Sequence, residues 1–294
     1  MGEITLLRNE ESTMSRQYST YPRQKQYKPR FYLIIILLSL LTITGSFILG
    51  QTFQSKRLTF KEEPVNYLTF ESISDISKWH NQELKFAYLT FDDGPSKNVT
   101  RILDILNHYD VKGTFFVLGS SIKNNINSEE ILNRMINEGH YIAMHSMTHD
   151  YKTLYGDNGP QNFVNEMNEL KELIASLTDG FQSQLCRAPY GTGGGTFKPN
   201  HIAALKAAGL KCWDWDVDSL DWKYKNAADI MSIIKQETEM KKNKQNLVIL
   251  FHEKDSTIEV LPQVIEYLQD QGYEILAYNP DHHFPDNFFN SNEI

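Results

Sequence analysis

The stretch FAYLTFDDGP, residues 86–95, decides how this chain is interpreted. Its first six residues predict a buried strand, and Gly94 and Pro95 end that strand with a turn. Between strand and turn stand two adjacent carboxylates, Asp92 and Asp93. Like charges in one place drive pKa values apart unless a cation or strong donors hold both groups ionised, so the pair calls for a metal ion or an arginine. The alternative is a plain surface turn, because Asp, Gly and Pro are ordinary turn formers.

From residue 86 onward, short apolar runs alternate with longer amphipathic runs, which is typical of βα units around a parallel sheet. Strands are predicted at 86–91, 114–118, 141–145, 185–188, 211–217, 247–251 and 273–277. Helices are predicted at 100–109, 129–138, 161–177, 201–208, 227–241 and 258–271. The last residues, 281–294, look like a frayed tail.

Polar residues gather at or just beyond the C-terminal ends of five predicted strands. They are Asp92, Asp93, His145, His149, Arg187, the run 216–221 and His252. In a βα barrel these ends converge on one face, whereas an open doubly wound sheet offers a crevice at a single switch point. Contributions from five strands favour an α/β barrel built on the seven predicted strands.

His145 and His149 stand four residues apart directly after a predicted strand. If the chain makes one helical turn there, both rings lie on the same face. Together with Asp93 they form a set of two histidines and one carboxylate, which suits Zn²⁺ or a similar divalent ion with positions left open for water and substrate. Two surface histidines in a polar loop are the alternative.

The segment RAPYG, residues 187–191, places a cation and a proline turn after another strand. Arg187 at this rim can hold Asp92 ionised and oriented, and the Tyr190 N–H can point into the site as an oxyanion donor. A solvated arginine before a turn is the alternative.

Two later segments add polar groups to the same predicted face. Residues 213–222 hold four carboxylates and three tryptophans, which is more carboxylate than core packing requires. His252 follows a very apolar strand, where a lone histidine is more often structural than catalytic.

Residues 31–50, FYLIIILLSLLTITGSFILG, carry no charge over a length that matches the ~20 residues needed to cross a bilayer. Five basic residues lie between 16 and 30 and only three follow closely, which places the N-terminus in the cytoplasm. A cleaved signal peptide is the alternative, but the run contains no alanine for an A-x-A cleavage site. We therefore expect an uncleaved, single-pass anchor in the cell membrane, with everything after residue 50 outside the cell.

The net charge and the two cysteines limit which partners and which disulfide bonds are expected. A net charge of -8 without a clustered basic face argues against nucleic acid as a partner, and no protein partner can be deduced. Cys186 and Cys212 lie at the end of one predicted strand and the beginning of the next, so a parallel pair would separate them by several residues of ~3.3 Å each. Two buried free thiols are expected.

Five segments in this order resemble the five motifs of the polysaccharide deacetylases, also called the NodB-homology or carbohydrate esterase 4 family. They are TFDDGPS (90–96), HSMTH (145–149), RAPYG (187–191), DVDSLDW (216–222) and LFH (250–252). The resemblance covers roughly 86–278 and is greatest to membrane-anchored peptidoglycan N-acetylglucosamine deacetylases. It implies a distorted (β/α)7 barrel, here preceded by a single transmembrane helix. One departure is Ala188, where the family often has proline, followed by the glycine-rich loop 191–196.

The resemblance also implies a role for each matching residue. Asp92 is similar to the catalytic base, Arg187 to the residue that orients it, and His252 to the general acid, which Asp221 pairs with. Asp93, His145 and His149 resemble the metal ligands. Tyr190 resembles the oxyanion donor, and Trp222 and Leu250 resemble the apolar wall around the acetyl methyl.

The expected organisation has five parts. They are a disordered cytoplasmic tail (1–30), a transmembrane anchor (31–50), an extracellular stalk (51–84), a NodB-type deacetylase domain (85–280) and a C-terminal tail (281–294). The expected activity is hydrolysis of N-acetyl groups of N-acetylglucosamine in peptidoglycan with one divalent ion, Zn²⁺ or else Co²⁺, Mn²⁺ or Ni²⁺. The alternatives are another glycan substrate (chitin oligomers, poly-N-acetylglucosamine or acetyl xylan) and a glycan-binding module without catalysis.

Overall fold

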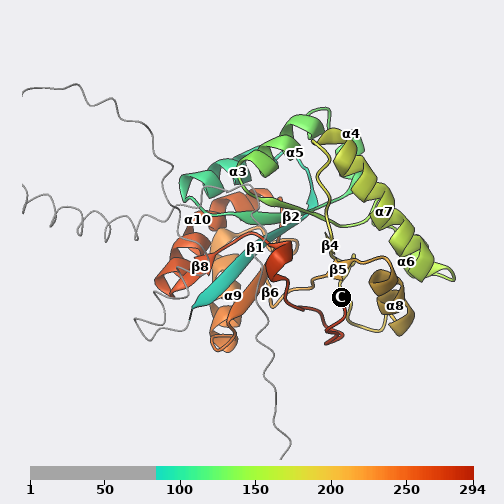
Figure 1. Ribbon diagram of the computed structural model, residues 1–294. Coiled ribbons are helices and arrows are strands. Elements are labelled where there is room, and N and C mark those ends of the chain that lie inside the picture. Colours follow the sequence, from blue (N-terminus) through green and yellow to red (C-terminus); the bar gives the residue numbers. More distant parts are fainter. Residues whose placement is uncertain (1–83) are drawn as a thin grey trace, which may run out of the picture.

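The computed structural model describes residues 84–294, coloured along the sequence in Figure 1. The predicted tail (1–30), anchor (31–50) and nearly all of the predicted stalk lie outside the described residues. Within 84–294, none of the helices combines the length and the apolar character needed to cross a bilayer. This finding corrects the predicted location in the cell membrane, which rested on residues 31–50.

Eight strands form one sheet, and every pair of neighbours is parallel. They are β1 Lys85–Gly94, β2 Gly113–Val117, β3 Tyr141–Met144, β4 Leu185–Cys186, β5 Lys211–Cys212, β6 Val217–Asp218, β7 Asn246–His252 and β8 Tyr273–Ile275. Their order is β5-β4-β3-β2-β1-β7-β6, and β8 pairs with β1. The predicted strand at 211–217 is therefore wrong as one element, because it divides into β5 and β6.

The division of that run explains the shape of the sheet. β5 and β6 are the two ends of the strand order, although only residues 213–216 separate them in the chain. The five Cα–Cα steps from Cys212 to Val217 span at most about 18 Å, so the two ends of the sheet must curl toward each other. Asp216 is bonded to β7, next to β6 in the strand order. Its N–H donates to Val248 O at 2.8 Å and its Oδ2 accepts from Val248 N–H at 3.0 Å. The result is a parallel α/β half-barrel.

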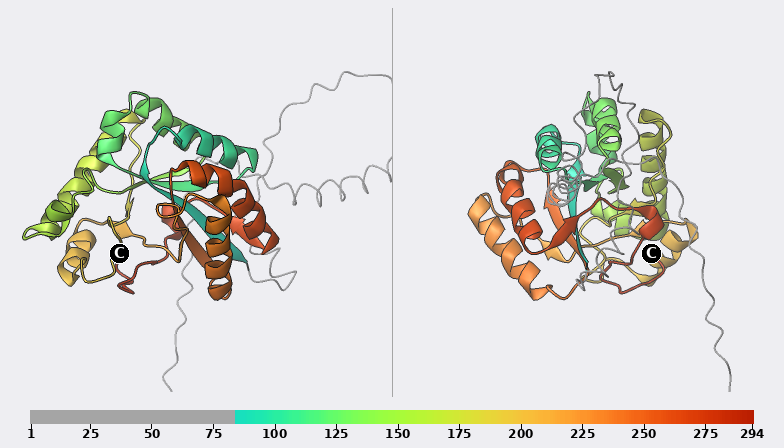
Figure 2. Two further views of the ribbon diagram at one scale, coloured as in Figure 1. Left: turned by 180° about the vertical axis from the view of Figure 1, so that it is seen from behind. Right: turned by 60° about the vertical axis from the view of Figure 1, so that its left-hand side comes forward.

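Helices cover the outside of the curved sheet (Figures 1 and 2). They are α3 Val99–His108, α4 Gly119–Asn124, α5 Ser128–Asn137, α6 Tyr151–Tyr155, α7 Gly159–Leu177, α8 Pro199–Ala207, α9 Ala227–Met240, α10 Asp255–Asp270 and the 3-10 turn η1 Pro280–His282. α9 packs on α10, α10 on α3, α3 on α5, α5 on α7 and α7 on α8, so the outer layer is continuous. The six predicted helices are present with shifted ends, whereas the short α4, α6 and η1 were not predicted.

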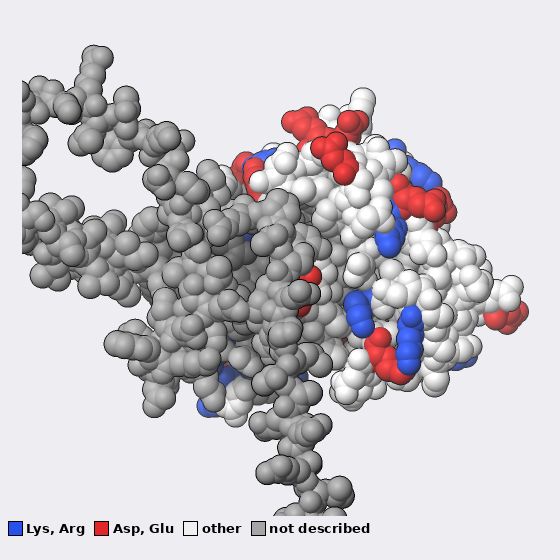
Figure 3. Space-filling model, viewed as in Figure 1, with Lys and Arg blue, Asp and Glu red and all other residues white. Residues whose placement is uncertain are grey.

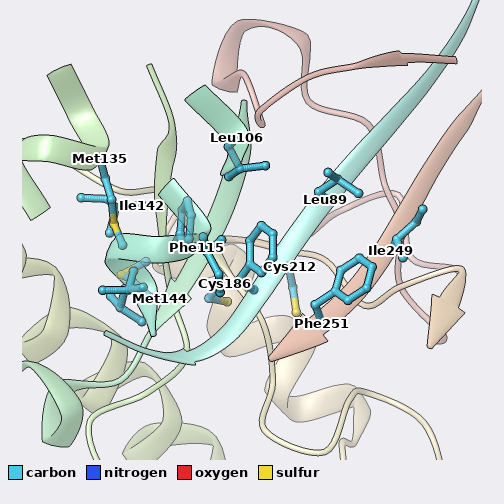
Figure 4. Packing of buried hydrophobic residues seen from close by; sticks show 14 of the residues in the cluster. Leu89, Leu106, Phe115, Met135, Ile142, Met144, Cys186, Cys212, Ile249 and Phe251 are labelled. Atoms are coloured by element: carbon cyan, nitrogen blue, oxygen red, sulfur yellow. The ribbon is translucent and has the colours of Figure 1, made fainter. Parts of the chain in front are cut away.

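Strand alternation divides the apolar residues into two layers. In β1, Leu89 and Phe91 face the helices and join the large outer core, and Phe91 stacks on Phe115 and Phe251. Figure 4 shows part of this core, with Leu89, Phe115 and Phe251 labelled. Phe86 and Tyr88 face inward and join a second cluster at the centre of the half-barrel. The next inward positions of β1 are Thr90 and Asp92. The same alternation therefore places a carboxylate at the C-terminal end of the inner face of the sheet, called the inner mouth below.

Cys186 and Cys212 are both buried free thiols, as predicted. The reason given for that prediction was wrong, because the two residues are direct partners in the β4–β5 register.

The C-terminal segment 281–294 packs against the domain, so the predicted frayed tail is wrong. Ile294 is fully buried, Phe284 O accepts from Trp213 Nε1–H at 2.8 Å, and Phe288 N–H donates to Asp214 Oδ2 at 2.7 Å. The tail therefore reaches the chain between β5 and β6. On the face in Figure 3, the described surface is mainly uncharged, and its charged side chains lie in small groups, of which the one at the top is acidic.

Candidate active site

The two carboxylates of the opening motif point in different directions because the backbone changes conformation between them. Asp92 continues the inward alternation of β1 and is 3% exposed. Asp93 has φ 70°, in the left-handed region that non-glycine residues rarely adopt, and the β1–β2 register shifts between Asp92 and Gly94. Consecutive side chains at a strand end can therefore take unlike partners.

Asp93, His145 and His149 come together as a group that could hold a metal ion. One ligand atom from each lies within 4.8 Å of the others, with Asp93 Oδ1 at 3.7 Å from His145 Nε2 and 3.8 Å from His149 Nε2. Asp93 Oδ1 is buried and has no hydrogen-bond partner among the described residues. A buried acceptor without a donor, facing two imidazole nitrogens, fits a divalent cation.

The histidine pair does not lie on a helical turn, which was the condition under which the sequence placed both rings on one face. Ser146 and His149 have φ values of 79° and 57°, so the chain between the two histidines follows an irregular left-handed path. The His149 N–H donates to Ser146 Oγ at 2.9 Å and stabilises that path. The two rings still lie 5.1 Å apart between centroids, so the side chains converge by a different backbone route.

The tautomer of His145 is fixed by a main-chain acceptor. Its Nδ1 lies 3.0 Å from Arg187 O, which can only accept, so Nδ1 carries the proton and Nε2 presents a lone pair. Burial lowers the pKa of His145, against the opposing charges of Asp92 and Asp93. A neutral ring with its Nε2 lone pair facing Asp93 is the form that binds metals.

Arg187 is fully buried and bonds to several segments at the C-terminal end of the inner face of the sheet. Its Nη1 donates to Asp92 Oδ1 and to Thr90 Oγ1, both at 2.8 Å. Its Nε and Nη2 donate to the main-chain oxygens of Trp213 and Asp214 at 3.1 and 2.7 Å. The guanidinium also lies over the ring of Phe116, 4.0 Å from its centroid. The base candidate is thus held by a cation that makes four directed hydrogen bonds, two of them to main-chain oxygens.

His252 ends β7 and pairs with Asp221, which follows β6. His252 Nδ1 lies 2.8 Å from Asp221 Oδ1, and Asp221 Oδ2 accepts from the His252 N–H at 2.7 Å and from Thr257 Oγ1–H at 2.5 Å. Burial lowers the pKa of His252, but the hydrogen bond and charge of Asp221, with the charges of Asp92 and Asp93, outweigh it and raise that pKa. His252 Nε2 lies 3.9 Å from Asp93 Oδ2, so the ring faces the candidate metal site.

The remaining predicted residues lie at the rim and in the wall. Tyr190 has φ 69°, and its N–H donates to no protein acceptor within residues 84–294. Its ring lies 4.7 Å from that of His149. Trp222 is exposed, and its Nε1–H donates to Asp218 Oδ2 at 3.4 Å. Leu250 is buried in β7 and is the register partner of both Thr90 and Asp218.

Sequence reasoning missed several residues that contact this set. Thr90 holds the same nitrogen of Arg187 as Asp92 does, and its position two residues before Asp92 in a strand could have revealed it. Asp214 accepts from Thr192 N–H at 2.8 Å, and also from the Thr192 hydroxyl and the Phe288 N–H. Two buried glutamates, Glu166 and Glu253, contact the segments that carry the histidines and Asp93. No local pattern marks either glutamate.

Five of the seven non-glycine residues with positive φ in the described chain lie in the site segments. They are Asp93, Ser146, His149, Tyr190 and Leu220. Such conformations cost of order 1–3 kcal/mol each and persist only where the surroundings enforce them. Their concentration at the C-terminal ends of the strands marks the functional face of the domain.

Fold and site together define the class: a parallel α/β half-barrel with a candidate metal site among the polar residues at the C-terminal ends of its strands. Residues 80–213 match the family model described as polysaccharide deacetylase. The peptidoglycan-N-acetylglucosamine deacetylase of Bacillus cereus is 34% identical over 272 residues, which are 89% of this chain and 97% of that protein. The chain belongs to the polysaccharide deacetylase family.

Solved structures agree with this assignment. The polysaccharide deacetylase Bc1974 from Bacillus cereus is 38% identical, with a TM-score of 0.65 over 71% of this chain and 100% of that chain. The catalytic domain of a peptidoglycan N-acetylglucosamine deacetylase from Eubacterium rectale is 26% identical, with a TM-score of 0.60 over 70% of this chain and 94% of that chain. The family model ends at residue 213, whereas Asp221 and His252 lie beyond it.

Proposed function

We propose that this protein hydrolyses the N-acetyl group of N-acetylglucosamine units in cell-wall peptidoglycan and releases acetate. The observation that carries the proposal is Asp92, which lies 2.8 Å from Arg187 on one side and 3.7 Å from the ligand candidate His145 on the other. The choice of peptidoglycan is supported by the names of the relatives from Bacillus cereus and Eubacterium rectale.

We infer that Asp93, His145 and His149 hold one divalent ion, with Zn²⁺ as the first candidate and Co²⁺, Mn²⁺ and Ni²⁺ as alternatives. Three protein ligands of these types leave positions open for water and substrate. When bound, such an ion supplies Lewis acidity toward the N-acetyl carbonyl and lowers the pKa of a water molecule.

Asp92 is proposed as the base that takes the proton from the attacking water. One of its oxygens is held by Arg187, while the other lies 3.7 Å from His145 Nε2. Positioned acid and base groups contribute about 10²–10⁴-fold each to such reactions. Arg187 is proposed to fix the direction of Asp92 and to offset its charge in the buried inner mouth.

His252 is proposed as the acid that gives a proton to the leaving amine. The raised pKa of His252 keeps the ring protonated over a wider pH range than an ordinary histidine, and Asp221 fixes Nδ1 so that Nε2 faces the site. We propose that the Tyr190 N–H donates to the carbonyl oxygen as negative charge develops there, a contribution worth about 10²–10³ in rate. Trp222 and Leu250 are proposed to contact the acetyl methyl.

The direct test is release of acetate by the full chain from purified peptidoglycan, chitin oligomers and acetyl xylan, with and without a chelator. We expect release from peptidoglycan that the chelator abolishes and added Zn²⁺ or Co²⁺ restores. Release from xylan alone would overturn the proposed substrate. No release from any glycan, by a folded and metal-loaded chain, would favour a glycan-binding module.

A further inference from the structure

Glu166 lies on α7, outside the set of residues that the reaction uses, yet it holds the segment between the two histidine ligands. The residue is 8% exposed. Glu166 Oε2 accepts from the main-chain N–H groups of Met147 and Thr148, both at 3.0 Å, and Oε1 accepts from the Thr148 hydroxyl at 2.8 Å. One buried carboxylate thus takes three donors from the residues directly between His145 and His149.

The same segment is held on its other side by α4. The Gly119 and Ser120 N–H groups donate to Ser146 O and Met147 O at 3.0 and 2.8 Å. Met147 lies so close to Gly119 that a Cβ there would collide with its sulfur. The segment is therefore fixed from two directions, its N–H groups by Glu166 and its carbonyl groups by the first turn of α4.

This bracing matters because the path between the ligands is strained. Ser146 and His149 both have positive φ, a conformation that persists only when surrounding contacts enforce it. Without Glu166, the buried Met147 N–H and the partly buried Thr148 N–H would lose their acceptor. An unsatisfied buried donor such as the Met147 N–H costs about 1–3 kcal/mol. The segment would relax toward other conformations in which His145 and His149 no longer converge on Asp93.

We propose that Glu166 is a positioning residue that sets the affinity of the metal site without touching the ion. The proposal rests on the metal site used in the proposed function. Partners that orient metal ligands typically account for about 10–100-fold in metal affinity. Glu166 acts on main-chain atoms, so its effect reaches both histidines at once.

The test measures the dissociation constant for Co²⁺. The metal-free full chain is titrated with Co²⁺, and the visible absorption of the bound ion is followed. We expect Glu166→Ala to raise this constant about 10–100-fold. Glu166→Gln should raise it less, because the amide oxygen still accepts main-chain N–H groups and the Thr148 hydroxyl can accept from the amide nitrogen. At saturating Co²⁺, acetate release by both variants should return to within a few-fold of the parent.

The matched control is Glu169→Ala on the same helix, since Glu169 is exposed and its one ion pair within residues 84–294 is with Lys123. It should leave the Co²⁺ constant unchanged. A folded Glu166→Ala with parental Co²⁺ affinity would overturn the proposal, as would equal losses in the Ala and Gln variants. If Glu166→Ala does not fold, Thr148→Ala removes the hydroxyl donor alone, and an unchanged constant there would contradict the proposal. If the parent chain binds Co²⁺ but releases no acetate, the proposed function is refuted instead.

A second, independent observation concerns exposed aromatic rings. Among the described residues, the strongly exposed aromatics are Tyr151, Tyr190, Trp222 and Phe288, at 47–58% exposure. Tyr190 and Trp222 belong to the proposed site, whereas Tyr151 and Phe288 have no role in it. The Tyr151 ring lies 5.7 Å from the Tyr190 ring, which itself lies 4.7 Å from the His149 ring.

Phe288 is held beside the loop that follows Tyr190. Its main-chain N–H donates to Asp214 at 2.7 Å, and its ring lies 5.1 Å from that of Trp215. A Cβ on Gly191 or Gly193 would approach the Phe288 ring to 3.2 Å, so both glycines admit the ring closely. Tyr151 lies beside the Tyr190 ring and Phe288 lies beside Gly191 and Gly193, so both rings adjoin the Tyr190 loop.

We infer that Tyr151 and Phe288 contact sugar units next to the one that is deacetylated. A fixed, half-exposed aromatic face packs against the apolar C–H face of a pyranose ring, and binding away from the reacting group can be used to raise the rate. This inference also rests on the proposed function.

The test compares kcat/KM on N-acetylglucosamine oligomers of one to five units and on 4-nitrophenyl acetate. Tyr151→Ala and Phe288→Leu should each reduce the gain with chain length about 3- to 10-fold and leave the small ester unchanged. Met240→Ala, an exposed residue on α9, is the control. Variants that keep the parental chain-length gain, or that lose activity on the small ester as well, would overturn the inference. A parent chain that releases no acetate from any oligomer or from peptidoglycan would refute the proposed function instead.

Discussion

Arg187 and Asp92 form a buried ion pair, 2.8 Å between Nη1 and Oδ1, at the centre of the half-barrel. The side chains of the pair are 0% and 4% exposed, so water replaces neither partner. Arg187 Nη1 also donates to Thr90, so the arginine, which follows β4, is bonded to two residues of β1. This pair links the stability of the domain to the orientation of the proposed base.

Replacing Arg187 should lower the free energy of unfolding more than replacing a surface arginine does. Arg187→Met leaves Asp92 buried without a cation, and breaking a buried pair in this way costs about 3–5 kcal/mol. Urea unfolding measures the loss. The control is Arg134→Met, because Arg134 pairs with Asp104 and Glu138 at the surface, where such pairs contribute about 0–1 kcal/mol. Equal losses for the two variants would contradict the account of the inner mouth.

Metal binding should stabilise the domain through Asp93, His145 and His149. A ligand at 100 times its Kd adds about 2.7 kcal/mol to the free energy of unfolding. We therefore expect Zn²⁺ or Co²⁺ to raise the Tm of the parent, and a chelator to reverse the rise. His149→Ala should lose most of that rise while keeping a similar Tm without metal. A parental shift in the variant would place the ion elsewhere.

The pH profile should depend on Asp221. Burial alone lowers the pKa of His252, and the bond and charge of Asp221 are the main causes that raise it. An acid must be protonated, so activity is lost as pH rises through the pKa of His252. The stability that the pair contributes is likewise complete below the unfolded-state value of about 6.5 and lost as pH rises through the raised folded value.

Asp221→Asn should therefore move the alkaline limb of kcat/KM to lower pH. Profiles of the parent, of Asp221→Asn and of the control Asp229→Asn, an exposed residue in the first turn of α9, provide the comparison. An alkaline limb that stays in place in Asp221→Asn would show that another group limits activity at high pH.

Gly94 should tolerate no side chain, because Glu253 fills the space beside it. A Cβ at Gly94 would collide with Glu253 Oε1 and lie 2.7 Å from its Cδ. Glu253 Oε2 accepts from the Ser96 N–H at 2.5 Å, so a displaced Glu253 loses that bond. Gly94→Ala should lower the free energy of unfolding by about 1–3 kcal/mol.

The shorter side chain in the double variant Gly94→Ala with Glu253→Asp should recover part of that loss. Thermal unfolding of both single variants and the double variant measures the coupling. Strictly additive losses would mean that Glu253 is not the obstacle.

Much of the site could be predicted because strand alternation and motif order are local properties of the sequence. Asp92 at an inward strand position, the two histidines after β3 and His252 after β7 follow directly from where polar residues end apolar runs. The parallel α/β fold follows from the alternation of short and long apolar runs in the same way.

What could not be predicted depends on contacts between distant segments. The split of 211–217 arises because Asp216 bonds with Val248, and the order of the C-terminal segment arises because Asp214 and Trp213 bond with it. The left-handed path from Ser146 to His149 relies on Glu166, which lies 17 residues or more away in the chain. None of these partners leaves a periodic signal, so a helical turn and a frayed tail were the natural expectations.

The most direct test of the proposed mechanism is acetate release by Asp92→Asn from peptidoglycan under saturating metal. Asparagine keeps the size and one acceptor oxygen of Asp92 but cannot take a proton from water. We predict a loss of about 10²–10⁴-fold in kcat, with the Co²⁺ dissociation constant close to that of the parent. Acetate release at the parental rate by this variant would contradict the role of Asp92 as the base.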